Sequence, residues 1–62
     1  SMTEIIDRAG GRVKLAEAAG VARPTVYEWR RVPPQHCMAV ARLIGCQLYE
    51  LRPDVYPGAD AP

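Results

Sequence analysis

The sequence predicts an all-α fold, a small bundle of four to five short helices that contains a helix-turn-helix. Apolar residues recur three and four positions apart along most of the chain, which is the spacing of one helix face. Glycines and prolines interrupt this pattern at short intervals, so the helices must be short. At 62 residues we expect one domain over residues 2–57, followed by a flexible tail over residues 58–62.

The first helix is expected over residues 3–9, with Thr3 as its N-cap. Two glycines then lead into a second helix over residues 12–19. The second helix should end at Gly20, because glycine readily adopts the left-handed backbone that closes a helix before a sharp turn. Val21 lies in that turn, where it can fill the angle between two helices.

A third helix is expected over residues 23–30, and Pro24 suits its first turn because a missing N–H costs nothing there. Two of its apolar residues stand three apart and form a stripe that can be buried against the second helix. The residues expected to form the core of this helix-turn-helix are Leu15, Ala16, Gly20, Val21, Val26 and Trp29.

The prolines after the third helix force an extended link before a fourth helix, expected over residues 34–44. Cys37 lies at a core position of that helix, and His36 is expected to be exposed in its first turn. A short fifth helix is expected over residues 47–51. The apolar residues near the end either pack onto the body of the domain or form a dimer surface: Leu48, Tyr49, Leu51, Val55 and Tyr56.

Positive charge is concentrated in the motif. Residues 12–31 hold five basic and two acidic side chains, a net charge of +3, whereas residues 46–62 carry a net charge of −2. A second helix that exposes such side chains can enter a DNA major groove. We expect base contacts from Arg23, Pro24, Thr25, Tyr27 and Glu28, and phosphate contacts from Arg12, Lys14, Arg30 and Arg31.

The side chains of the third helix suit different contacts. Arg23, at the helix start, can bind guanine O6 and N7 in a bidentate manner. Thr25 can contact phosphate or a thymine methyl group, and Tyr27 can reach phosphate through its hydroxyl or pack on a sugar. Glu28 can accept a hydrogen bond from cytosine N4, or hold Arg31 or Arg12 in position. The alternative for each is a solvated surface without a ligand.

The motif resembles that of phage Cro and repressor proteins, and the chain resembles the small YdaS-type, Cro-like family over about residues 4–57. The residues that carry this resemblance are the Gly10-Gly11 opening, the Arg31-Val32-Pro33 exit, Cys37, Gly45 and the ending LRPDVYP. The resemblance implies a Cro-like fold and a protein of phage or prophage origin. Because the family is associated with toxin–antitoxin loci, it also suggests an antitoxin-like role.

The sequence departs from the family pattern at four positions. Ala22 stands where a serine or threonine N-cap is usual, which removes a side-chain cap worth ~1 kcal/mol. Arg12, Arg23 and Pro24 replace glutamines.

Nothing in the sequence indicates an enzyme, a cofactor, a small-molecule substrate or a metal. There is one histidine, the two cysteines are nine residues apart without a CxxC pair, and no glycine-rich phosphate loop or nucleophile–base set occurs. No signal peptide or membrane-spanning segment is evident, so we expect a reduced, cytoplasmic setting without membrane contact.

These observations predict a sequence-specific double-stranded-DNA-binding transcriptional regulator, a repressor that acts by occupying an operator. The small core favours a homodimer, formed in solution or only on DNA, with half-sites about 34 Å apart. The alternative is a protein-interaction module that has kept the fold without DNA binding. The two differ in whether the arginines of the motif lie on an open face or pair with Glu17 and Glu28.

Overall fold

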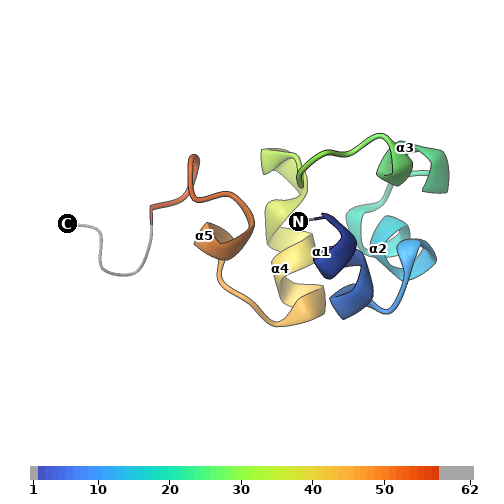
Figure 1. The fold of residues 1–62 in the computed structure, drawn as a ribbon, viewed down its shortest axis with the longest axis horizontal. Coiled ribbons are helices and arrows are strands. Elements are labelled where there is room, and N and C mark those ends of the chain that lie inside the picture. Colours follow the sequence, from blue (N-terminus) through green and yellow to red (C-terminus); the bar gives the residue numbers. More distant parts are fainter. Residues whose placement is uncertain (1, 58–62) are drawn as a thin grey trace.

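A computed structural model describes residues 2–57, and the expected tail over residues 58–62 lies outside the described residues. Within residues 2–57 all regular secondary structure is helical and no strand occurs, which confirms the predicted all-α fold. The elements, shown in Figure 1, are α1 (Met2–Ala9), α2 (Arg12–Ala19), α3 (Arg23–Tyr27), the 3-10 helix η1 (Pro34–His36), α4 (Cys37–Ile44) and α5 (Leu48–Leu51).

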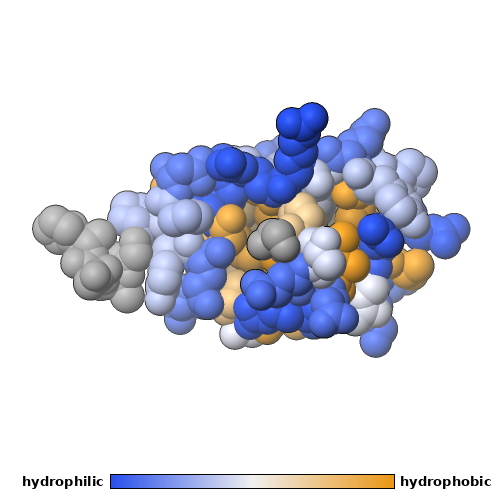
Figure 2. All heavy atoms as spheres, in the orientation of Figure 1, coloured by the Kyte–Doolittle hydropathy of each residue, from blue (hydrophilic) through white to orange (hydrophobic). Residues whose placement is uncertain are grey.

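Helix α4 organises the bundle. It packs against α1, α2 and α5, while α3 packs against α2. Figure 1 accordingly shows α3 and α5 at opposite ends of the molecule, with α1 and α4 between them. On the face shown in Figure 2, hydrophobic residues gather in the middle and hydrophilic residues surround them. The side chains that are completely or almost completely buried come from α2, α3, α4 and the link before η1: Leu15, Val26, Val32, Cys37 and Val40.

The turn between α2 and α3 forms as predicted. Gly20 has φ 73° and ψ 31°, a left-handed conformation that a residue with a Cβ rarely adopts. Its N–H donates to the carbonyl of Glu17 at 3.2 Å, and the N–H of Val21 donates to the carbonyl of Ala16 at 3.0 Å. These two bonds satisfy carbonyls at the end of α2 and turn the chain sharply into α3.

The predicted start of the first helix is wrong. Helix α1 already includes Met2, so Thr3 lies within the first turn and is not the N-cap. The predicted fourth helix is divided, because the N–H of His36 donates to the carbonyl of Pro33 at 2.9 Å. This bond spans three residues, so the first turn is a 3-10 helix and the α-helix begins at Cys37.

The predicted third helix is three residues too long. Helix α3 ends at Tyr27, and the N–H groups of Glu28 and Trp29 donate to carbonyls three residues earlier, those of Thr25 and Val26. These bonds span three residues and not four, and Trp29 lies beyond the end of α3. Its indole stacks on the ring of His36, with 5.5 Å between ring centroids and 23° between planes. His36 is therefore half-buried, which corrects the expectation of an exposed residue.

The C-terminal segment packs back onto the bundle. Leu51 is buried, and Leu48 and Tyr56 pack against the core, so these candidates for a dimer surface serve intramolecular packing. Tyr49 is half-buried, and Val55 remains 40% exposed. The Tyr56 hydroxyl donates to the carbonyl of Pro34 at 3.4 Å. The end of the described chain is thereby tied to the link that follows the helix-turn-helix.

Candidate nucleic-acid interface

Helices α2 and α3 cross through a small apolar contact. Leu15 and Ala16 of α2 and Val26 of α3 are buried, and Val21 and Trp29 are half-buried against the same core. Gly20 contributes its backbone conformation and is itself exposed. The buried surface of α3 is thus fixed against α2, and the opposite surface of α3 is left to solvent.

The side chains on the open surface of α3 are the ones expected to contact bases. Arg23, Pro24 and Glu28 are exposed, Tyr27 is 64% exposed and Thr25 is half-buried. Ala22 is the N-cap, in an extended conformation and without a side-chain capping bond, as its residue type requires. Pro24 lies in the first turn, where it removes no helix hydrogen bond. The start of α3 therefore offers an arginine on an uncovered, uncapped helix end.

Arg12 reaches across from the start of α2 to the end of α3. Its guanidinium carbon lies 4.6 Å from the centroid of the Tyr27 ring. Gly11 provides no side-chain cap to α2. Lys14 lies close by on the same helix, with its aliphatic stem over Gly10: its Cδ would be only 3.1 Å from a Cβ placed there. The first turn of α2 therefore carries two basic side chains, of which Arg12 lies beside α3 and Lys14 lies over Gly10.

The basic residues of the motif do not pair with its acidic residues in the part of the chain that the structure describes. The ion pairs found in residues 2–57 are Arg31–Asp54, at 3.6 Å, and Arg52–Asp54, at 2.7 Å. Glu28 therefore holds neither Arg12 nor Arg31, contrary to one of its expected roles. All four phosphate-contact candidates, Arg12, Lys14, Arg30 and Arg31, are exposed, and Arg31 also pairs with Asp54 of the C-terminal segment.

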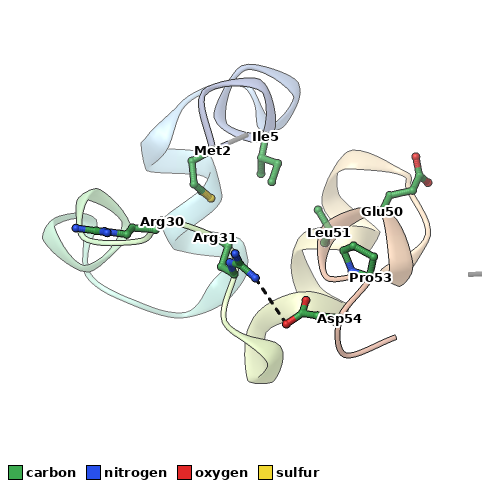
Figure 3. Close-up of a pocket in the computed structure, with 8 residues that line it drawn as sticks. All are labelled: Met2, Ile5, Arg30, Arg31, Glu50, Leu51, Pro53 and Asp54. Atoms are coloured by element: carbon green, nitrogen blue, oxygen red, sulfur yellow. Dashed lines mark ion pairs between the residues drawn. The ribbon is translucent and has the colours of Figure 1, made fainter. Parts of the chain in front are cut away.

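Arg31 lies in an open pocket of about 330 Å³ between α1, the segment after α3 and the segment around α5. Figure 3 shows Arg31 directed at Asp54, while its neighbour Arg30 points away from that carboxylate. The apolar lining comes from Met2 and Ile5 on one side and Leu51 and Pro53 on the other. The structure thus separates two adjacent arginines that were expected to act together.

The family described as bacterial toxin YdaS matches residues 2–60, almost the whole chain. The chain belongs to this family. No curated protein and no solved structure gives a match. The YdaS family and the all-helical fold are therefore confirmed, and the family's description is that of a bacterial toxin.

In this member of the YdaS family, the ending LRPDVYP stabilises the fold through Arg52 and Asp54. Arg52 donates from Nε and Nη2 to the two carboxylate oxygens of Asp54, at 2.9 and 2.7 Å. Its Nη1 donates to the carbonyl of Val32 at 3.1 Å. Asp54 thereby accepts two hydrogen bonds from Arg52 and forms an ion pair with Arg31, and the segment after α5 is fixed to the link after α3. We call Arg31, Val32, Arg52 and Asp54 the C-terminal clasp.

Sequence reasoning missed the clasp and the burial of Val32. Val32 is completely buried, although it lies in a link that pattern reading treats as a connector. The buried Cys37 thiol donates to the carbonyls of Pro33 and Val32 at 3.4 and 3.7 Å. Burial raises the pKa of this thiol, so it stays protonated and able to donate at neutral pH. The sequence did contain one signal for the burial of Val32: it is an apolar residue between Arg30-Arg31 and Pro33-Pro34.

Two further observations concern membrane-spanning helices and metal sites in this YdaS-family protein. No helix among residues 2–57 is long and apolar enough to cross a membrane. Nor does this part of the chain bring three histidine, cysteine or acidic side chains together in a group that could hold a metal ion.

Proposed function

We propose that the protein is a sequence-specific double-stranded-DNA-binding transcriptional regulator that acts by occupying an operator. The observation that supports this most directly is the open surface of α3. Its first turn presents Arg23 to solvent, and within residues 2–57 Arg23 has no acidic partner. A side chain in this position can reach guanine O6 and N7 when the helix enters the major groove.

The surrounding charges suit the phosphates that flank such a groove. Arg12 and Lys14 stand on the first turn of α2, and Arg30 follows α3 with its guanidinium directed away from the clasp (Figure 3). Arginine and lysine on either side of a recognition helix contact the two backbones and fix its register, while the helix itself reads bases. The protein would thus bind DNA through three basic side chains around one reading helix.

Operator occupancy would also account for a toxic effect. A protein bound at an operator acts by excluding polymerase or a competing repressor from a promoter. If the occupied promoter drives a gene that growth requires, blocking that promoter stops growth. The family's description as a bacterial toxin would then follow from the same DNA contact. One DNA-binding activity would therefore make the protein both a regulator and a toxin.

The test is a comparison of two arginine variants on a duplex selected from a random pool. Arg23→Ala should weaken binding by about 1–3 kcal/mol and relax the preference at one base position. Arg42→Ala removes the same charge from an exposed position of α4, outside the motif, and serves as the matched control. It should leave the base preference unchanged.

An Arg23→Ala variant with an unaltered preference at every base would show that Arg23 does not read DNA. If the wild-type protein selects no duplex at all, the alternative of a protein-interaction module takes the place of the regulator. The short α3 of five residues and the diversion of Arg31 to the clasp are the features that favour this alternative.

A further inference from the structure

Arg12 and Tyr27 form a contact that the core of the domain does not require. Tyr27 is the last residue of α3 and is 64% exposed, and Arg12 is the exposed first residue of α2. The guanidinium carbon lies over the ring, 4.6 Å from its centroid. An exposed tyrosine and an exposed arginine would be free to adopt many rotamers if they did not attract each other through the ring face and the positive charge.

This contact leaves Arg12 able to bind an anion. The attraction depends on the charge of the guanidinium and the quadrupole of the ring, so it does not require the N–H donors of the group. No acidic side chain of the described chain pairs with Arg12, although Glu28 directly follows Tyr27. The tyrosine thus restricts the position of an arginine whose donors remain available.

We propose that Tyr27 is a positioning residue that acts on DNA through Arg12. It holds the Arg12 guanidinium between the start of α2 and the end of α3, where that group binds a backbone phosphate beside the groove that α3 enters. This rests on the proposed function and adds to it a residue role: Tyr27 contributes to affinity for every DNA sequence and does not read a base.

The assignment predicts a distinct pattern among variants. Tyr27→Phe keeps the ring and should bind as the wild type does, because the hydroxyl takes no part. Tyr27→Ala should bind every duplex about two- to fivefold more weakly, as expected for one exposed cation–π contact. Arg12→Ala should also weaken all binding and lower the slope of log K against log salt by about one. In an Arg12→Ala background, Tyr27→Ala should have no further effect.

The experiment measures the anisotropy of two labelled duplexes, one selected from a random pool and one unrelated. Met38→Ala is the matched control, since it removes another large side chain that is 56% exposed, from α4. NMR of the free protein supplies a readout without DNA. The ring of Tyr27 should shift the Arg12 Nε–H resonance, and this shift should persist in Tyr27→Phe and vanish in Tyr27→Ala.

Several outcomes would overturn the assignment. A Tyr27→Phe variant as weak as Tyr27→Ala would make the hydroxyl the contact, and a changed preference at one base would make Tyr27 a reading residue. An effect of Tyr27→Ala that survives in the Arg12→Ala background would show that Arg12 is not the intermediary. If wild type binds and Tyr27→Ala binds equally well, only this assignment is lost. If wild type binds no duplex, the proposed function is lost together with it.

Discussion

Asp54 is the residue on which the end of the domain depends most. Its carboxylate accepts two hydrogen bonds from Arg52 and lies 3.6 Å from Arg31. Arg52, only 13% exposed, is held in turn by the carbonyl of Val32. The hydrogen bonds from Arg52 lower the pKa of Asp54 from 3.8 to about 2. A carboxylate held in this way favours the folded state only while it is ionised.

The clasp should therefore be sensitive to acid. Because the pKa of Asp54 is lower in the folded chain than in the unfolded one, its stabilisation is complete above about pH 4 and is lost as the pH falls through about 2. Urea unfolding should show Asp54→Asn to be less stable than the wild type at pH 6. The difference should shrink between pH 4 and pH 2.

The control for this measurement is Asp7→Asn, which changes an exposed acid of α1 that forms no ion pair within residues 2–57. Its difference from the wild type should not follow the same pH window. A gap between wild type and Asp54→Asn that stays constant from pH 6 to pH 2 would show that the charge of Asp54 is irrelevant.

At the residue level, the sequence was informative where a local rule decides the outcome. The left-handed glycine at position 20, the proline in the first turn of α3 and the core position of Cys37 all follow from residue type and spacing. Val32 and Arg52 could not be found in this way. Their roles depend on contact between segments 20 residues apart, which no periodicity records.

Among the elements, α3 is the weakest by its own sequence. It is five residues long and has an alanine at its N-cap. The N–H of Thr25 bonds only to the backbone carbonyl of Ala22, at 3.0 Å, and Pro24 has no N–H to offer. The tertiary contacts of Val26 and Trp29 with the core must therefore maintain this helix.

A better cap should stabilise α3. Ala22→Ser places a hydroxyl where it can accept a hydrogen bond from the N–H of Thr25, and the N-cap backbone is already extended, with φ −71° and ψ 150°. We expect a gain of about 0.5–1 kcal/mol in the free energy of unfolding, measured with urea. Ala18→Ser, within α2, is the comparison and should be neutral or destabilising. Equal effects of the two substitutions would contradict a capping role for position 22.

Two of the helix ends that were predicted wrongly, the end of α3 and the start of α4, lie beside the same tertiary contact. The apolar spacing of Val26 and Trp29 is compatible with a continuous helix, and nothing local forbids one through residue 30. Helix α3 ends earlier, at Tyr27, and Trp29 beyond its end stacks on His36, a residue from a different element. Similarly, the 3-10 turn at Pro34–His36 places His36 where this stacking occurs. Tertiary contacts here override a pattern that is locally consistent.

For the whole molecule, the described chain has one buried core around α4 and an uneven distribution of charge. The all-α fold and the family follow from the sequence, since both depend on patterns that extend over nearly the entire chain. The residues of the candidate interface could also be named from spacing. Their mutual arrangement could not, because the contact of Arg12 with Tyr27 and the diversion of Arg31 to Asp54 depend on how helices cross.

The proposed DNA contact involves one end of the molecule, and Arg52 and Asp54 of the clasp lie toward the other. Helices α2 and α3 carry the candidate interface, whereas α5 and the segment after it supply Arg52 and Asp54 (Figure 1). A clasp variant should therefore affect stability more than base preference, while a variant of Arg23 should do the reverse. Stability and DNA recognition can thus be altered separately.

The proposed function requires the open surface of α3 to read a DNA sequence. The most direct test is the anisotropy of a labelled duplex selected from a random pool, titrated with the wild-type protein between about 50 and 200 mM salt. We predict tight binding that persists at the higher salt on a palindromic duplex, with two chains per site, and much weaker binding to an unrelated duplex. Binding that is equally weak on every sequence and disappears at the higher salt would contradict the claim.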